Sequence, residues 1–237
     1  MLTPARARGH EMLDAPDADP ALALRSLRDV ALANRLFGGR HAVLSALDAL
    51  WRKPGAPTRW SLLDIGTGLG DIPAAAARRA AQRGVTLRSI GLERIVPIAV
   101  AASARCDSVC CASAFALPFA DRSIDVVTCS QVLHHFEGQE AHALLRECTR
   151  VARRAVIVGD LRRSWLAVAG IWSASFALGF HPVSRHDGAL SVRRGFTRRE
   201  LEALVYEATG CHATVRQTPG FRLSAYWQPA PTTSQPS

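Results

Sequence analysis

Residues 62–71 have the sequence Leu-Leu-Asp-Ile-Gly-Thr-Gly-Leu-Gly-Asp, which is the most informative stretch of the chain. The largely apolar residues 62–65 have the pattern of a buried strand, and they run directly into three glycines that alternate with other residues. Glycine permits a tight turn and a close approach of the backbone to another group. A helical pattern begins at Pro73. A strand, a glycine loop and a helix in this order predict a ligand site at the carboxyl end of the strand.

Short apolar runs alternate with helical stretches on the carboxyl side of this loop. The runs lie at 62–65, 87–92, 109–112, 124–129 and 155–158, and the helical patterns lie at 73–83, 97–105 and 139–153. This alternation predicts a parallel sheet with helices on both faces. Two later runs, at 213–215 and 221–227, are expected to close the sheet as an antiparallel pair. The predicted fold class is therefore α/β, a doubly wound, seven-stranded and mostly parallel sheet.

Three parts of the chain differ in their pattern. Residues 1–55 are predicted to be an N-terminal helical segment with a break at Gly38-Gly39, residues 56–227 the main domain with a helical cap insertion at 161–196, and residues 228–237 a loose tail. Residues 164–180 carry no charge and include Trp165 and Trp172. They are too few to span a membrane, which takes about 20 apolar residues, and predict a buried or pocket-covering helix. Docking on a membrane surface remains an alternative.

Composition narrows the class of protein. The 237 residues include 29 basic and 20 acidic side chains, and 48% are hydrophobic, which excludes a mainly disordered chain. All basic residues but Lys53 are arginines spread along the whole length, so a nucleic-acid partner is not favoured. The six cysteines lack metal-site spacing and are expected to be reduced and largely buried. Residues 1–20 lack a leader pattern, so a cytoplasmic location is expected.

The glycine loop predicts what kind of ligand binds. Asp71 stands where a dinucleotide-binding loop has its third glycine, which disfavours a nicotinamide cofactor. Asp64 suits a cationic or zwitterionic ligand better than a pyrophosphate. Glu93 ends the second predicted strand, 23 residues (93 − 70) after Gly70, where a carboxylate can accept hydrogen bonds from ribose hydroxyls. Adenosine joined to an amino acid, as in S-adenosylmethionine, fits these features.

Four motifs carry a family resemblance over residues 62–160. The stretches 64–70, 91–93, 116–127 and 144–151 resemble the class I S-adenosylmethionine-dependent methyltransferases, most closely the ubiquinone and menaquinone biosynthesis type. The stretches 34–40, 159–164 and 185–194 resemble a bacterial subgroup associated with polyketide and phenolic-lipid pathways. The resemblance implies a Rossmann-like methyltransferase fold and a set of cofactor-binding residues: Asp64, Gly66, Thr67, Gly68, Gly70, Glu93, Arg94, Ser113, Ala114 and Ser130.

The chain departs from that family at one position. An acidic residue that contacts the adenine amino group is usual after the third strand, and Ser113 occupies this position. A hydroxyl still forms hydrogen bonds, but the charge-assisted contact is lost, which weakens cofactor binding by on the order of 1 kcal/mol.

Two histidine pairs are candidates for a general base. The resemblance places His135 near the acceptor, and the alternative is that His134 and His135 both only cap or pack a turn. His186 and Asp187 are the second candidate, because a neighbouring carboxylate raises the basicity of a histidine. The alternative there is a plain turn, for which Asp187-Gly188 is a typical dipeptide. Ser130 and Gln131 are candidates for orienting either ligand.

The sequence thus predicts methylation of a small, largely apolar acceptor in secondary metabolism, most simply at a phenolic or enolic hydroxyl. The alternatives are C-methylation of an aromatic or polyketide acceptor, a cofactor-binding protein without activity, and an RNA methyltransferase. Arg162, Arg163 and Arg193 are candidates for holding an acidic acceptor. No metal ligands are predicted, and the oligomeric state is left open.

Overall fold

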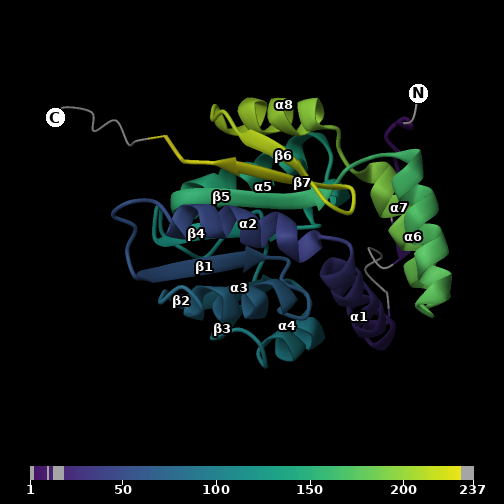
Figure 1. The fold of residues 1–237 in the computed structure, drawn as a ribbon, viewed down its shortest axis with the longest axis horizontal. Helices are drawn as coiled ribbons and strands as arrows, with labels where there is room; N and C mark the ends of the chain where they lie inside the picture. Colours follow the sequence, from purple (N-terminus) through teal and green to yellow (C-terminus); the bar gives the residue numbers. More distant parts are fainter. Residues whose placement is uncertain (1–2, 10, 13–18, 231–237) are drawn as a thin grey trace.

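The computed structural model describes residues 3–9, 11–12 and 19–230. Its centre is a seven-stranded sheet of order β3-β2-β1-β4-β5-β7-β6 (Figure 1). Strands β1 to β5 pair in parallel, and β7 pairs antiparallel with both β5 and β6. The predicted fold class is confirmed. The strands are β1 Arg59–Ile65, β2 Thr86–Glu93, β3 Ser108–Cys111, β4 Ile124–Ser130, β5 Ala152–Leu161, β6 Thr214–Thr218 and β7 Arg222–Trp227.

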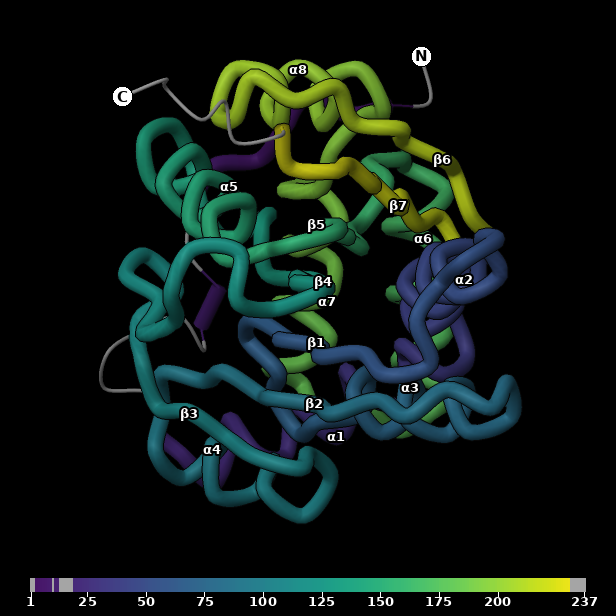
Figure 2. Tube along the Cα trace, turned by 90° about the vertical axis from the view of Figure 1, so that its left-hand side faces the viewer, coloured from purple at the N-terminus to yellow at the C-terminus, as the bar shows by residue number. Residues whose placement is uncertain are grey.

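Helices cover both faces of the sheet, because successive strand residues point to opposite sides. Leu62 and Val126 belong to one buried cluster with the helices α2 and α3, whereas their neighbours Leu63 and Val127 belong to another with α5 and α8. Figure 2 shows α2 and α5 on opposite sides of the sheet. The bounds of these helices are α2 Gly39–Trp51, α3 Asp71–Ala81, α5 Gly138–Val151 and α8 Arg198–Thr209, and α4 Val96–Ala102 lies against β2 and β3.

Three helices form a cap beyond the carboxyl edge of the parallel strands. They are α1 Pro20–Leu36, α6 Trp165–Ala177 and α7 Pro182–Arg194, and they lie together past the end of β1 in Figure 1. Helix α7 contacts α1, α6 and the short 3₁₀ helix η2 at Leu133–His135. The cap thereby covers the loops that follow β1 and β4.

Local signals set several helix ends. Thr197 and Glu200 form a reciprocal capping box at the start of α8, which ends at Gly210 with φ 70°. Gly38 separates α1 from α2 with φ 77°, and a Cβ there would lie 2.3 Å from the carbonyl oxygen of Pro219. Only glycine fits this close approach of two backbones.

Helix α6 covers the pocket, which is one of the two forms expected from the sequence: its inner side lines the pocket, and Trp165, Trp172 and Phe176 are about half exposed. Two other expectations from the sequence need correction. Asp187-Gly188 is not a turn, because both residues lie inside α7, which begins with Pro182 at its first position. Only three of the six cysteines are buried, and Cys111 is exposed.

Two expectations concern the ends of the chain and membranes. Of the tail predicted at 228–237, residues 231–237 lie outside the described part of the chain, as do residues 1–2, 10 and 13–18 of the predicted N-terminal segment. Within the described residues, none of the helices has the length and apolar character needed to cross a membrane.

Candidate active site

A cavity of about 710 Å³ lies between the carboxyl edge of the sheet and the cap. The sheet side contributes the glycine loop and the residues that follow β2, β3 and β4, and the cap side contributes one face each of α1, α6 and α7. Most of the side chains from the cap are apolar: Leu27, Val30, Ala33, Ala167, Ile171 and Val192. The cover is therefore largely apolar, but it also includes polar side chains from α1 and α7: Ser26, Asp29, Ser184, Asp187 and Ser191.

The glycine loop lines the floor with bare backbone. Gly66 and Gly68 both have positive φ, of 61° and 54°, and both line the cavity. A Cβ at Gly66 would lie 2.6 Å from a methyl carbon of Val132, so a larger residue would force the loop to move. Glu93 lies beside this loop: its Oε2 accepts a hydrogen bond from the Gly68 N–H at 3.2 Å, and its Oε1 accepts one from the Arg94 N–H at 2.9 Å.

Asp64 supports the loop from beneath and does not line the cavity. Its buried carboxyl accepts hydrogen bonds from Thr128 Oγ1 at 2.6 Å and Thr67 Oγ1 at 2.9 Å. Burial raises the pKa of Asp64 to about 7, against the effect of these two hydrogen bonds. Thr67, Gly70 and Ser130 also lie outside the cavity lining, although the sequence placed all four residues in the cofactor site. Gly70 instead packs beside Cys106.

The segment after β3 forms one wall of the cavity. Ser113 and Ala114 both line it, as does Arg94 after β2. The Ser113 hydroxyl accepts a hydrogen bond from the Phe115 N–H at 3.2 Å. The ring of Phe115 meets that of Phe136 edge to face, with centroids 5.0 Å apart. This wall therefore combines two aromatic rings with one hydroxyl and the side chain of Arg94.

The two adjacent histidines have different surroundings. His135 lines the cavity, whereas His134 is buried, with its Nδ1 2.7 Å from Oδ1 of Asp160. Burial alone would lower the pKa of His134, but the negative charges of Asp160 and Glu11 raise it to about 9. The same ion pair lowers the pKa of Asp160 against the effect of its burial. His134 is therefore a structural cation, and His135 is the member of the pair that faces a ligand.

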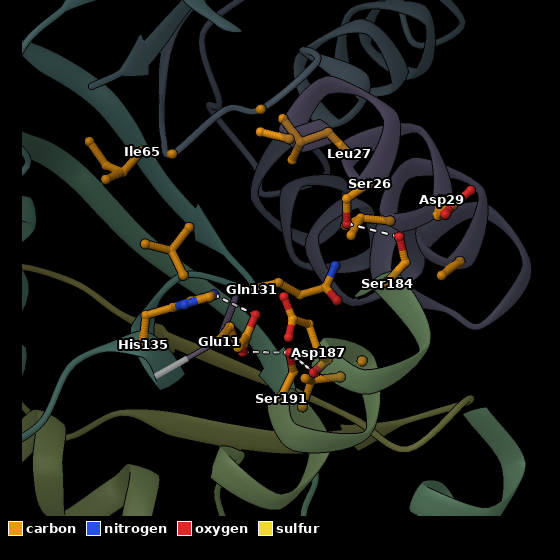
Figure 3. A pocket seen from close by; sticks show the side chains of 18 of the residues that line it. Glu11, Ser26, Leu27, Asp29, Ile65, Gln131, His135, Ser184, Asp187 and Ser191 are labelled. Atoms are coloured by element: carbon orange, nitrogen blue, oxygen red, sulfur yellow. Dashed lines mark hydrogen bonds and ion pairs between the residues drawn. The ribbon is translucent and has the colours of Figure 1, made fainter. Parts of the chain in front are cut away.

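Glu11 lines the cavity, although no motif in the sequence predicted it as a site residue. It reaches the cavity from the N-terminal segment, and Figure 3 shows it between His135 and Ser191. Its Oε1 accepts a hydrogen bond from Ser191 Oγ at 2.6 Å, and its Oε2 lies 4.0 Å from Nε2 of His135. A residue more than 100 positions from both partners in the chain carries no local signal of this contact.

Glu11, His134 and His135 also place metal-type donor atoms within 4.8 Å of one another. The charges around this cluster do not suit a metal ion. His134 is protonated at neutral pH, since its pKa is raised to about 9, and the Arg194 guanidinium lies 3.8 Å from Glu11. These three residues and Arg194 therefore form a network of ion pairs.

His186 and Asp187, the second candidate pair for a general base, lie in different environments. Asp187 is buried and lines the cavity, where its Oδ1 accepts a hydrogen bond from the Met12 N–H at 3.1 Å. His186 lies 3.0 Å from the same carboxylate, but its side chain is 62% exposed and does not line the cavity. Asp187 thus ties the N-terminal segment to α7, and His186 is turned away from any ligand.

The middle of the chain matches a known family. Residues 63–158 correspond to the family described as a methyltransferase domain. This stretch of the chain is therefore a methyltransferase domain. No curated protein matches the chain in sequence.

Solved structures with the same fold as this methyltransferase domain are numerous. One from Aquifex aeolicus, a SAM-dependent methyltransferase, is 13% identical with a TM-score of 0.59, and the match covers 90% of this chain and 99% of that one. The O-methyltransferase NcsB1 of neocarzinostatin biosynthesis is 20% identical with a TM-score of 0.61, over 90% of this chain and 59% of that one. A putative O-methyltransferase from Nostoc punctiforme is 17% identical with a TM-score of 0.62, over 94% and 64%. At these identities the likeness is one of fold.

The three arginines expected to hold an acidic acceptor do not line the methyltransferase cavity. Arg163 is paired with Glu200 at 2.6 Å, and Arg162 donates to the side chain of Gln217 at 2.5 Å. Arg222, which the sequence did not single out, lines the cavity instead. Its position at the start of the antiparallel strand β7 brings it to the carboxyl edge of the parallel strands, beside Leu161 at the end of β5.

Proposed function

We propose that this methyltransferase methylates a phenolic or enolic hydroxyl of a small, largely apolar acceptor in secondary metabolism. The observation that carries the proposal is that His135 and the glycine loop line one cavity, whose cover is apolar. An acceptor ring fits such a cover, and His135 is within the same space to take its proton.

The residues present fit S-adenosylmethionine, which supplies a methyl group already activated on a sulfonium when bound. The bare backbone at Gly66 and Gly68 leaves room for a close approach, and the Glu93 carboxylate can accept hydrogen bonds from ribose hydroxyls. We assign Arg94, Ser113 and Ala114 to the adenine end, with the Ser113 hydroxyl as a neutral partner. Asp64 and Thr67 support the loop from outside the cavity, and the predicted residues Gly70 and Ser130 also lie outside its lining.

In this proposal His135 takes the proton from the acceptor hydroxyl as the new bond to oxygen forms. A base positioned near a hydroxyl contributes roughly 10²-fold to 10⁴-fold. The backbone of the pair is held by Arg194, whose Nη2 donates to the His135 carbonyl at 2.7 Å and whose Nε donates to the His134 carbonyl at 3.2 Å. The apolar cap excludes water, which would compete with the acceptor.

One structural neighbour supports an aromatic hydroxyl acceptor. The structure of NcsB1 holds S-adenosylmethionine and 2-hydroxy-5-methyl naphthoic acid. That compound is a hydroxylated aromatic acid, and a ring with a hydroxyl is the chemistry that the largely apolar cover and His135 of this chain suit.

Two measurements test the proposal. The first is a calorimetric titration of the purified protein with S-adenosylhomocysteine, where micromolar binding is expected. The second is methyl transfer from S-adenosylmethionine to a panel of phenols and naphthols by the wild type, His135→Ala and His186→Ala. The matched control is His186→Ala, because this histidine lies outside the cavity, and only His135→Ala is expected to lose about 10²-fold or more in kcat. Equal activity of the two variants would contradict the role of His135.

A further inference from the structure

Arg222 is a buried cation that faces the cavity. Its residue surface is 4% exposed, and it lines the cavity at the start of β7. Its Nε donates a hydrogen bond to the Phe37 carbonyl at 3.1 Å, and its Nη1 donates to Gln131 Oε1 at 2.7 Å. Both acceptors are neutral oxygens, so neither compensates the charge of the guanidinium.

The other buried arginines of this end of the molecule have acidic partners. Arg163 lies 2.6 Å from Glu200, and Arg194 lies 3.8 Å from Glu11. Across the part of the chain that the structure describes, Arg222 forms no ion pair with a carboxylate. Burial lowers the pKa of Arg222 to about 10, and the distant negative charge of Asp160 opposes this only in part.

A second feature holds the guanidinium at the cavity. Gln131, which accepts from Arg222, has a φ of 56°, an unusual conformation for a residue other than glycine. Its N–H donates to the Gly159 carbonyl at 2.7 Å, and its side-chain amide donates to Asn34 Oδ1. The backbone of Gln131 and the side chain of Asn34 thus fix the amide oxygen that receives Arg222.

An unpaired buried charge is costly unless something in its surroundings compensates it. The guanidinium stays protonated at physiological pH, and its planar fork matches a carboxylate with two parallel hydrogen bonds. The cavity is the side from which such a partner can arrive.

We propose that Arg222, held by Gln131, binds a carboxylate inside the cavity. Two small molecules of the reaction can carry it: the amino-acid end of the cofactor, or an acidic group on the acceptor. The possibility that the acceptor carries the carboxylate rests on the proposed function. It would narrow the substrate class to hydroxylated aromatic acids.

Matched ligand pairs on the wild-type protein test the proposal and separate the two sources. The first pair is S-adenosylhomocysteine and its decarboxylated analogue, measured by calorimetry. The second pair is 3-hydroxy-2-naphthoate and 2-naphthol, titrated into protein saturated with S-adenosylhomocysteine. A charge-assisted contact predicts about 10-fold to 100-fold tighter binding of the acid in one pair. Preference in the first pair assigns the cofactor, and preference in the second assigns the acceptor.

Variants then connect the preference to the residue. We expect Arg222→Met to abolish the preference and Arg222→Lys to keep part of it. The matched control is Arg216→Met, because Arg216 is exposed on the neighbouring strand β6 and does not line the cavity. In this control variant, the preference for the acid in either ligand pair should equal that of the wild type.

The proposal is overturned if the acid of neither pair binds more tightly than its neutral partner to the wild type. It is also overturned if the preference survives in a folded Arg222→Met protein. Should that variant not fold, the Arg222→Lys protein decides, because an acid preference equal to that of the wild type would also overturn the proposal. All of these experiments measure binding. If the acid and neutral ligands bind equally, the carboxylate proposal fails and the methyl-transfer proposal stands. If the acid binds more tightly but no phenol is methylated, only the methyl-transfer proposal fails.

Discussion

The Nδ1 atom of His134 lies 2.7 Å from Oδ1 of Asp160, and both side chains are buried at the carboxyl edge of the sheet. Asp160 also accepts the backbone N–H groups of His134 at 3.1 Å and Leu161 at 2.7 Å. One carboxylate therefore ties the turn after β4 to the end of β5. This tie holds His135, the next residue, at the cavity.

Replacing His134 by glutamine is expected to destabilise the fold by about 3–5 kcal/mol, because Asp160 would keep a buried charge without its cation. Urea unfolding at pH 6 measures this. His186→Gln is the control, since that exposed side chain should change the free energy of unfolding by less than about 0.5 kcal/mol. A loss below about 1 kcal/mol for His134→Gln would contradict a buried ion pair.

The same pair predicts a pH dependence of stability. The folded pKa of His134, about 9, exceeds its unfolded value of 6.5, so its contribution is complete below pH 6.5 and is lost as the pH rises through 9. The contribution is at most about 3 kcal/mol. The free energy of unfolding of the wild type, relative to His134→Gln, should therefore fall between pH 6.5 and 9. A constant difference across that window would argue against a protonated His134.

Asp64 predicts a second pH effect at lower pH. Burial raises its pKa from 3.8 to about 7, so the folded state favours the protonated form, and this stabilisation is lost as the pH rises through 7. Asparagine resembles the protonated carboxyl, so the stability of Asp64→Asn relative to the wild type should rise between pH 5 and pH 8 by about 3 kcal/mol. Thermal or urea unfolding of both proteins at the two pH values checks this, and a stability difference that stays constant between them would refute it.

The glycine loop predicts a graded response to alanine. Gly66→Ala adds a Cβ 2.6 Å from Val132 at a positive φ, so it should lower stability by about 1–3 kcal/mol and weaken S-adenosylhomocysteine binding at least about 10-fold. Gly84→Ala is the control: its φ is +68°, but nothing lies within 4 Å of the added Cβ. It should show the conformational cost alone, with binding unchanged. Calorimetry with both variants separates the two effects.

Ser113 predicts a gain of affinity. Aspartate at this cavity-lining position would restore a charge-assisted contact to the adenine amino group, and Ser113→Asp should bind S-adenosylhomocysteine about fivefold more tightly, close to 1 kcal/mol. Ser103→Asp, at an exposed serine after α4 outside the cavity, controls for added negative charge. Equal affinities of the two variants would mean that the adenine lies elsewhere.

The sheet, its covering helices and the glycine-loop side of the cavity could be predicted from local sequence patterns. Strand and helix periodicity fixed the layers, because each element must bury one face. The glycines at 66 and 68 and the carboxylate of Glu93 are read from local spacing, since parallel strands bring their carboxyl ends to one edge. The structure places all three of these residues at the cavity.

The side chains that reach the cavity from elsewhere in the chain could not be predicted in this way, because their positions depend on how the elements pack together. Glu11 and Arg222 come from opposite ends of the chain and meet the cavity through the N-terminal segment and the antiparallel strand β7, a placement that no local pattern encodes. Burial and partners, which depend on packing, decided that His134 pairs with Asp160 while His135 faces the cavity, and that Asp64 lies beneath the loop. Local periodicity reports which face of an element is apolar, but which partner covers that face is settled by the assembled fold.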